Sequence, residues 1–259
     1  MVCVVAFLQF INNLTETIPL GFGVSTKKNE VDLAVLCYNV KCSGVEYANN
    51  QEAIANQILQ ESPDIVFLCE FHLSVSKKLD SIMTHKREYK SYYRSKSNCI
   101  FYSKFEIDSI ASIDTYTSSG KRAKNNIVHV FTPKGTLAIV GCHLSSSRKD
   151  FRQGCRNRAM EADSIFKRIC TENNPVVVMG DLNDISGSYA VERIKEVGLK
   201  DAWWEGGLGY GSTFHNKWLR LRLDHILYKD SKLDLQYVKV IDSDLSDHNA
   251  LVAGFTFRQ

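Results

Sequence analysis

Short apolar runs that end in polar side chains recur along this chain of 259 residues. The clearest run is residues 176–179, four apolar residues that are typical of a buried strand. Gly180 ends that strand, and Asp181, Asn183 and Asp184 come directly after it. Ligand sites in α/β sheets lie just beyond the carboxyl ends of strands, so the pattern indicates a site there. A strand followed by Gly-Asp is also ordinary turn chemistry, so this segment alone leaves both interpretations open.

Other apolar runs carry polar residues of the same kind at or near their ends. These residues are Asn39, Glu70, His143, Asp224, Asp247 and His248. For any one of them a cap, a turn or a satisfied core polar group is a sufficient explanation. A buried charge is costly unless it is paired or bound to a metal, so their repetition favours one shared site. The set offers oxygen ligands and two imidazoles but no group of thiolates, which favours Mg²⁺ or Mn²⁺ over Zn²⁺.

The hydrophobic periodicity predicts mainly strands, with a few amphipathic helices. Strands are expected at residues 32–40, 65–69, 89–93, 99–102, 106–114, 127–132, 136–142, 176–179, 223–228, 235–240 and 251–257. Helices are expected at residues 49–61, 74–84, 148–172 and 188–197, and residues 206–211 are expected to form a loop. The inner face of the third helix is predicted to carry Phe151, Cys155, Ala159, Ala162, Phe166 and Ile169. Two packed sheets with helices outside them is the natural architecture for this pattern.

Cysteine usage and charge narrow the class of protein. The eight cysteines have no Cys-x-x-Cys or Cys/His spacing, which argues against a zinc knuckle. Several of them lie inside apolar runs, as expected of small buried side chains in a reducing compartment rather than of a disulfide framework. A formal net charge of +3 is too small to indicate nucleic-acid binding through bulk electrostatics.

The N-terminal segment is apolar but short. Residues 1–11 are apolar except for Gln9, whereas a membrane span needs about 20 such residues. No basic region or cleavage site of a signal peptide is evident. The segment is either a hydrophobic arm packed on the domain or the last turns of a membrane helix. The second alternative would place the protein at a membrane. Residues 25–30 form a polar linker, so we expect an arm with its linker at 1–30 and a single domain at 31–259.

The chain contains, in this order, the segments YNV, PDIVFLCE, GCHLSS, VVVMGDLND, RLDHILY and SDHNALVAGF. From residue 31 to the C-terminus it therefore resembles the endonuclease/exonuclease/phosphatase superfamily. The resemblance is closest to bacterial members that often follow N-terminal membrane helices. It implies an α/β (α+β) four-layer sandwich, in which two mixed, mostly antiparallel sheets pack face to face between outer layers of helices. It also implies metal-dependent hydrolysis of a phosphoester.

The resemblance implies a role for each polar residue at a strand end. Glu70 resembles the principal Mg²⁺ ligand, with Asn39 beside it and Asp247 as an additional ligand. His248 resembles the catalytic imidazole and Asp224 the carboxylate that orients it.

The remaining roles concern water and substrate. Asp181 resembles the residue that positions or deprotonates the attacking water, whereas Asn183 and His143 would hold phosphoryl oxygens. Attack is expected to be direct, because no cysteine or serine nucleophile is needed. Side chains expected to contact the substrate are Asn98, Arg148, Arg152 and Thr213, with Arg220 and Arg222 on a basic rim. Trp203 and Trp204 either line the substrate mouth or pack on the core.

The expected activity is that of a Mg²⁺-dependent phosphodiesterase, nuclease or phosphatase, with Mn²⁺ as a substitute, acting as a monomer. Nucleic acid, a phospholipid head group and a small phosphorylated metabolite all remain open as the substrate. The alternative is a catalytically inactive binding domain on the same fold. Retention of the complete set of polar strand-end residues argues against that alternative, because an inactive relative is expected to have lost at least one of them.

Overall fold

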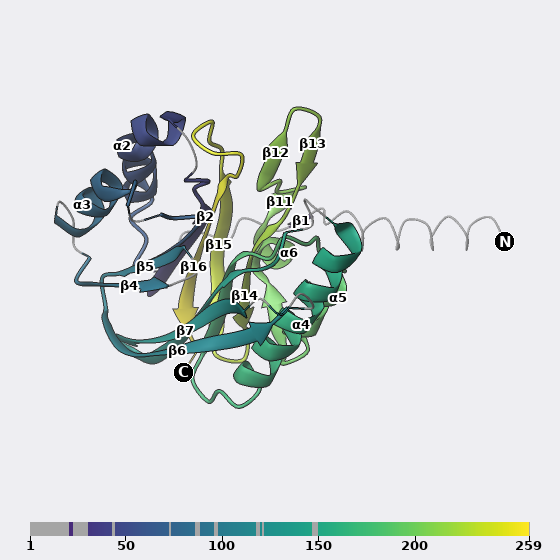
Figure 1. Cartoon of the computed structure of the whole chain (residues 1–259). Helices are drawn as coiled ribbons and strands as arrows, with labels where there is room; N and C mark the ends of the chain where they lie inside the picture. Colours follow the sequence, from purple (N-terminus) through teal and green to yellow (C-terminus); the bar gives the residue numbers. More distant parts are fainter. Residues whose placement is uncertain are drawn as a thin grey trace.

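Two six-stranded sheets pack face to face, with helices on both outer faces (Figure 1). The computed structural model describes residues 21–22, 31–42, 45–72, 74–85, 89–95, 98–117, 120, 122–146 and 150–258. Of the arm and linker predicted at residues 1–30, residues 1–20 and 23–30 lie outside the described residues. The predicted four-layer sandwich is confirmed.

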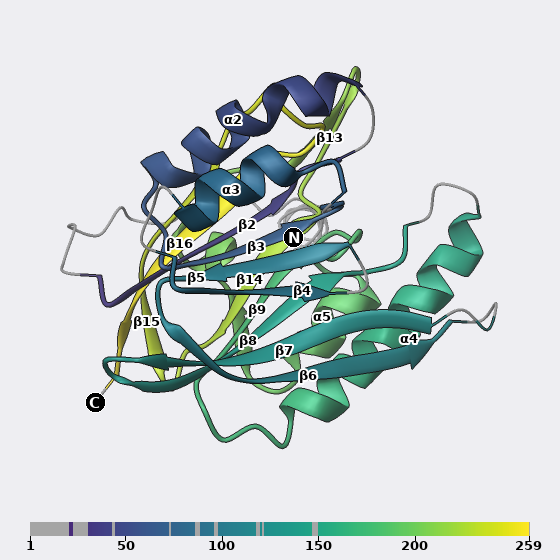
Figure 2. The same ribbon diagram turned by 60° about the vertical axis from the view of Figure 1, so that its left-hand side comes forward.

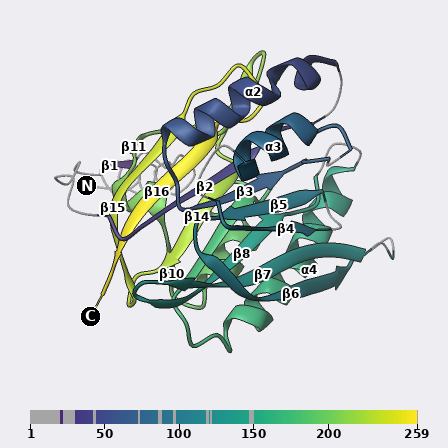
Figure 3. The same cartoon turned by 90° about the vertical axis from the view of Figure 1, so that its left-hand side faces the viewer.

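The first sheet contains the strands that follow the N-terminal segment and those that close the chain. In spatial order they are β15 (Leu233–Ile241), β16 (Ala250–Phe257), β2 (Leu33–Asn39), β3 (Ile65–Cys69), β5 (Cys99–Ser103) and β4 (Ser91–Ser95). The pair β2 and β3 is parallel, and the other neighbouring pairs are antiparallel. The outer face of this sheet is covered by α2 (Val45–Gln60) and α3 (Lys77–His85), which lie side by side in Figures 2 and 3.

The second sheet contains the middle of the chain. In spatial order its strands are β10 (Leu199–Asp201), β14 (Asp224–Lys229), β9 (Val176–Asp181), β8 (Gly135–His143), β7 (Arg122–Thr132) and β6 (Glu106–Tyr116). Only β8 and β9 are parallel among the neighbouring pairs of this sheet. The outer face is covered by α4 (Phe151–Ile169) and α5 (Tyr189–Lys195).

Smaller elements lie beside the sheets. The short helix α6 (Ala202–Gly206) contacts β15, and β1 (Gly21–Phe22) pairs with β11 (Leu208–Gly209). The strands β12 (Phe214–Asn216) and β13 (Leu219–Leu221) form a hairpin that stands beyond the ends of the sheets in Figure 1. The predicted loop at 206–211 therefore contains the end of α6 and all of β11, and the β12–β13 hairpin was not predicted.

Side-chain alternation along the strands decides which polar residues reach the space between the sheets. In β2, Val35 and Cys37 lie in the apolar core between the sheets, so Asn39 follows on the same face at the end of the strand. In β9, Met179 lies in that core and Asp181 follows by the same step. The two-residue repeat of each strand therefore directs both Asn39 and Asp181 into the space between the sheets.

The register of the second sheet adds two more polar residues to that layer. Asp181 pairs with His143 of the parallel strand β8 on one side and with Asp224 of the antiparallel strand β14 on the other. The sheets approach closely here, because a Cβ added to Gly141 would lie 2.4 Å from the rings of Phe67 and Phe101. Close packing of the sheets brings the polar ends of both into contact.

Helix α4 differs from its prediction in both its start and its inner face. Asp150 is the N-cap and accepts a hydrogen bond from the Gln153 N–H, so the helix begins at residue 151 rather than at 148. Phe151 was predicted to face inward but is 72% exposed, whereas Arg158 and Glu161 are buried. The prediction was wrong because apolar periodicity assigns charged residues to the solvent face, whereas these two bind groups of the core.

Candidate active site

Asn39 joins the two sheets at the polar end of the sandwich. Its side chain is 1% exposed, and Nδ2 donates to Asp181 Oδ2 at 2.9 Å and to Glu70 Oε1 at 3.2 Å. The two amide hydrogens therefore bind carboxylates that come from different sheets. A buried carboxylate needs such donors, because burial without a partner is costly.

Asp224 and His248 form a buried pair next to this contact. His248 Nδ1 lies 2.7 Å from Asp224 Oδ2, and His248 Nε2 lies 3.8 Å from Asp181 Oδ2. The Phe214 ring packs against the imidazole with 5.1 Å between the ring centroids. Burial lowers the pKa of His248, but the charge of Asp224 and its hydrogen bond outweigh burial and raise that pKa to about 9. The imidazole is therefore held in one orientation, and the charge of Asp224 favours its protonated form.

Thr213 fixes the backbone of this pair. Its Oγ1 accepts hydrogen bonds from the N–H groups of Leu223 at 3.0 Å and Asp224 at 2.9 Å. Its side chain is completely buried. Thr213 was expected to contact the substrate. Its hydroxyl is instead enclosed and accepts hydrogen bonds from the backbone at the start of β14.

Asp181 is enclosed by donors from its own loop. Its Oδ1 accepts from the Asn183 N–H at 2.8 Å, and its Oδ2 accepts from Asn183 Nδ2 at 3.2 Å. The same Nδ2 donates to the Leu144 carbonyl oxygen at 2.9 Å, so both amide hydrogens of Asn183 are used within the protein. Burial and then the charge of Asp224 raise the pKa of Asp181, against the opposing charges of the two site histidines.

His143 lies between the carboxylates of the two sheets. Its Nε2 is 3.8 Å from Glu70 Oε1 and 3.9 Å from Asp181 Oδ2. The Asn125 Oδ1 accepts from the backbone N–H of His143 at 3.1 Å and fixes its position. Burial lowers the pKa of His143, but the hydrogen bond with the Cys99 thiol and the charge of Asp181 raise it to about 9. A protonated imidazole here faces an anionic site.

Asp247 is connected to Asn39 through Lys41, a residue that was not among the predicted site residues. Lys41 Nζ lies 2.6 Å from Asp247 Oδ2, and the Lys41 N–H donates to Asn39 Oδ1 at 3.1 Å. The signal in the sequence was a basic residue two positions after Asn39. The structure thus brings together all eight residues predicted to act in catalysis or metal binding.

Two buried arginines hold the loops behind these residues. Arg158 donates from Nε to Asp184 Oδ2 at 2.9 Å and from Nη1 to the Ser145 carbonyl oxygen at 3.0 Å. Glu161 accepts from the Ser145 N–H at 3.0 Å, so helix α4 fixes the segment that follows His143. Sequence reasoning missed this network, since its partners are distant along the chain.

Arg222 is the centre of the second network and does not belong to a basic rim. It is 1% exposed and binds Asp201 with Nη2 at 2.8 Å from Oδ2. His225 Nδ1 lies 3.2 Å from the same oxygen, and its Nε2 lies 3.0 Å from the Asp184 carbonyl oxygen. The prediction of a rim position for Arg222 was wrong because this buried carboxylate pairs with it.

The other residues expected near the substrate have varied environments. Asn98 is exposed, and its carbonyl oxygen accepts from the Phe71 N–H directly after Glu70. Arg152 is exposed on α4, and Arg148 lies outside the described residues. Trp203 is buried in the core between the sheets, which agrees with the packing interpretation given for it.

The donor set fits a divalent cation. Asp181, Asp224 and His248 carry possible ligand atoms within 4.8 Å of one another, but a protonated His248 would leave only the two carboxylates as ligands. Asp224 Oδ1 is buried and has no hydrogen-bond partner among the described residues, as expected of an oxygen that awaits a cation or a donor. Glu70 adds a partly exposed carboxylate. Oxygen-rich sets of this kind suit Mg²⁺ or Mn²⁺.

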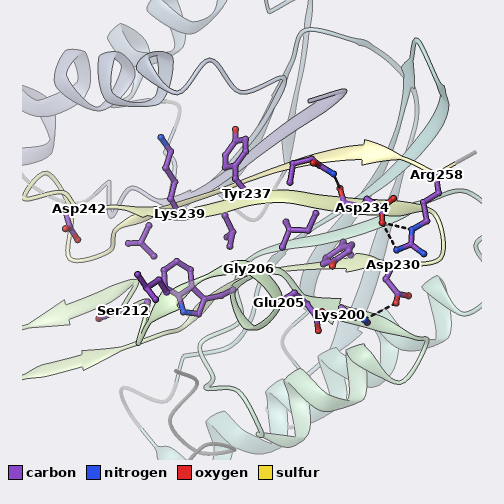
Figure 4. Close-up of a pocket in the computed structure, with 18 of the residues that line it drawn as sticks. Lys200, Glu205, Gly206, Ser212, Asp230, Asp234, Tyr237, Lys239, Asp242 and Arg258 are labelled. Atoms are coloured by element: carbon purple, nitrogen blue, oxygen red, sulfur yellow. Dashed lines mark hydrogen bonds and ion pairs between the residues drawn. The ribbon is translucent and has the colours of Figure 1, made fainter. Parts of the chain in front are cut away.

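A cavity of about 690 Å³ lies elsewhere, between α6 and β15 (Figure 4). Two ion pairs lie in its lining, with Lys200 Nζ 3.3 Å from Asp230 Oδ2 and Arg258 Nε 2.7 Å from Asp234 Oδ1. None of the eight candidate catalytic and metal-binding residues lines it. The eight candidate residues therefore lie at the strand ends and not in this cavity. No helix in the described part of the chain has both the length and the apolar character to span a membrane.

Comparisons with known proteins agree with the fold. The sequence profile described as "Endonuclease/Exonuclease/phosphatase family" matches residues 36–248. No curated protein sequence matches the chain. The structure is similar to D. rerio TDP2 complexed with single strand DNA product, with a TM-score of 0.71 and 16% identity over 86% of this chain and 98% of that one.

Two further solved structures show the same likeness. Truncated Caenorhabditis elegans TDP2 has a TM-score of 0.65 and 24% identity over 87% of this chain and 97% of that one. A protein of the endonuclease/exonuclease/phosphatase family from Leptotrichia buccalis C-1013-b has a TM-score of 0.67 and 17% identity. That match covers 87% of this chain and 100% of the other. At these identities the structural likeness shows the shared fold.

Proposed function

Because the chain belongs to the endonuclease/exonuclease/phosphatase family, we propose that it is a Mg²⁺-dependent phosphodiesterase that hydrolyses its substrate by direct attack of water. The observation that carries this proposal is the buried Asp224–His248 pair with Asp181 opposite it. The Nε2 of His248 lies 3.8 Å from Asp181 Oδ2, which is beyond direct hydrogen-bond distance. A water molecule or a phosphoryl oxygen bridging these two atoms would meet a proton donor and a proton acceptor together.

Each residue of the chain has a defined part in this reaction. Asp181 accepts the proton of the attacking water, and its raised pKa makes it a stronger base than an ordinary aspartate. His248, oriented by Asp224, donates from Nε2 to an oxygen of the phosphoryl group as negative charge develops there. His143 supplies a second protonated imidazole at the same charge.

Glu70 would hold Mg²⁺, with Asn39 fixing the carboxylate. When bound, the ion supplies a Lewis acid that neutralises the charge of the phosphoryl oxygens. Mn²⁺ prefers the same ligands and would substitute for it.

Asn183 would serve the substrate by exchanging a hydrogen bond. Its Nδ2 bond to Asp181 is the longer of its two, at 3.2 Å against 2.9 Å to the Leu144 carbonyl oxygen. The longer bond, to Asp181, would break when substrate binds. The amide hydrogen freed in this way would donate to a phosphoryl oxygen. The expected role of Asn183 is thereby kept, and the loop stays anchored through Leu144.

Single-stranded nucleic acid is the first substrate to test, because the D. rerio structure contains a single strand DNA product. Phospholipid head groups and small phosphorylated metabolites are the further candidates. We also retain the single catalytic domain at residues 31–259 and the attachment of the chain to a membrane through its apolar N-terminus as proposals.

The experiment is hydrolysis of bis(p-nitrophenyl) phosphate with and without Mg²⁺ or Mn²⁺. We expect turnover that requires the metal and that is lost in His248→Ala and Glu70→Ala. The matched controls are His85→Ala and Glu106→Ala, which remove the same groups from exposed positions in α3 and β6. A folded, metal-binding wild type that hydrolyses neither this ester nor any of the three substrate classes would support an inactive binding domain instead.

A further inference from the structure

The β12–β13 hairpin carries the most exposed large apolar side chain that the structure describes. Trp218, in the turn of the hairpin, is 97% exposed, and Leu219 beside it is 51% exposed. The turn stands beyond the ends of the two sheets (Figure 1). Single exposed apolar residues are ordinary, but an indole and a leucine held together at the tip of a projecting hairpin are a feature that a partner can bury.

A further exposed leucine lies on the preceding strand. Leu208 of β11 is 79% exposed, and residues 210–213 are all that separates β11 from β12. Because β1 pairs with β11, the segment that precedes Gly21 joins the molecule beside Leu208. In that segment, residues 1–11 are apolar except for Gln9. The exposed apolar side chains and the apolar N-terminal segment are therefore connected to neighbouring short strands.

The same stretch of chain is basic. Residues 206–223 contain Lys217, Arg220 and Arg222 but no aspartate or glutamate. Arg222 is buried against Asp201, whereas Lys217 and Arg220 are exposed on the hairpin. Exposed cations beside exposed apolar side chains suit a partner that is anionic at its surface and apolar beneath.

The leucines distinguish between two partners that both carry phosphate groups. Single-stranded nucleic acid stacks its bases on aromatic rings, which would use Trp218 but leave Leu208 and Leu219 exposed. A lipid bilayer accepts leucine in its acyl region and tryptophan at the level of the head groups. It would cover all three side chains, while Lys217 and Arg220 meet the phosphates of anionic lipids.

We propose that the tip of the β12–β13 hairpin, together with Leu208 of β11, docks on the surface of an anionic phospholipid bilayer. This contact is separate from the apolar N-terminus and does not depend on the proposed hydrolysis. A single weak anchor gives only reversible attachment, so a second contact on the folded domain makes attachment stable.

The base of the hairpin reaches the candidate active site. Phe214, the first residue of β12, packs against His248 with 5.1 Å between the ring centroids. The strand from Phe214 to Trp218 covers about 13 Å of extended chain. Docking through the tip therefore brings the candidate site close to the bilayer surface.

The test is sedimentation of the full chain with vesicles of equal parts phosphatidylcholine and phosphatidylserine. We expect the wild type to sediment with the vesicles, and Trp218→Ala combined with Leu219→Ala to bind about tenfold or more weakly, because burial of both side chains is lost. Trp204→Ala combined with Met160→Ala is the matched control. It removes an exposed indole and an exposed aliphatic chain from α6 and α4, and should bind as the wild type does.

Charge is tested by reversal. Lys217→Glu combined with Arg220→Glu should weaken binding to these vesicles, and should matter less on vesicles of phosphatidylcholine alone. Lys134→Glu combined with Lys232→Glu reverses the same number of charges in exposed turns before β8 and β15, and should weaken binding much less.

Insertion of the indole is tested by fluorescence. Phosphatidylcholine brominated on its acyl chains quenches a tryptophan that reaches the bilayer. Quenching of the full chain should be lost in Trp218→Phe and should persist in Trp204→Phe.

The outcomes separate this inference from the proposed activity. A wild type that does not bind vesicles, or equal binding by the wild type and the Trp218→Ala, Leu219→Ala variant, would overturn it. If that variant loses affinity for a single-stranded oligonucleotide and keeps its affinity for vesicles, the hairpin is a nucleic-acid surface and the inference is wrong. Sedimentation requires no turnover, so a protein that binds vesicles without hydrolysing any phosphoester counts against the activity alone.

Discussion

Asn39 Nδ2 lies 2.9 Å from Asp181 Oδ2, although the two residues are 142 positions apart in the chain. This contact joins the ends of the two sheets. The same amide group binds Glu70 at 3.2 Å. One side chain thereby sets the distance between the carboxylate proposed to hold the metal and the carboxylate proposed to accept a proton.

Asn39→Ala should lower kcat/KM by about 10- to 100-fold, the usual effect of removing a group that orients metal-binding or catalytic side chains. Both carboxylates lose their shared donor and should move apart. The measurement is steady-state kinetics with the best substrate, together with Mn²⁺ affinity. Asn216→Ala, an exposed position in β12, is the matched control, and equal losses in the two variants would contradict the prediction.

Thr213→Val should destabilise the protein by about 1–3 kcal/mol, because two N–H groups lose their acceptor in a buried position. It should also lower kcat, since Asp224 is no longer held at the start of β14. Thr213→Ser keeps the hydroxyl and should retain most of both quantities. Urea denaturation and kinetics on the same samples decide the matter; a stable, fully active Thr213→Val would show that the bonds are dispensable.

Asp201 should make stability depend on pH in the acid range. Burial by itself raises the pKa of Asp201, but the charge of Arg222 and the bonds of His225 hold that pKa far below its ordinary value of 3.8. A lowered folded pKa contributes stability that is complete above the unfolded pKa and is lost as the pH falls below it. The free energy of unfolding of the wild type should therefore decrease as the pH falls below about 3.8.

Asp201→Asn tests the origin of that dependence. It should cost about 3–5 kcal/mol at pH 7, because it leaves the buried Arg222 without its anion. Its free energy of unfolding should then change less between pH 4 and lower values than that of the wild type. An unchanged slope in this range would assign the acid sensitivity to other carboxylates.

The orientation of α4 can be tested with two substitutions. Phe151→Ala should change the free energy of unfolding by less than about 0.5 kcal/mol, because the ring is 72% exposed. Ile165→Ala should cost about 2–5 kcal/mol, because that side chain is completely buried. The inner face expected from the sequence predicts a large loss for Phe151→Ala, so thermal or urea unfolding distinguishes the two arrangements.

The sequence alone predicted the layers and the polar strand ends, because both depend on local patterns. A period of two residues places Asn39 and Asp181 on the same face as the core residues that precede them. That period is visible in any strand, whatever the rest of the chain does. The four-layer sandwich and the approach of the eight predicted residues to one another were therefore within reach of the sequence.

Tertiary structure decided which polar groups pair with which. Lys41 and Asp247 are 206 residues apart, and no local pattern connects them. Arg158 and Glu161 were not part of the predicted inner face of α4, because a charged residue is buried only when a distant partner compensates it. The hydroxyl of Thr213 likewise acquired its role only when β14 was placed against it. Periodicity reports whether a side chain faces inward, whereas the identity of its partner follows from the packing of the whole domain.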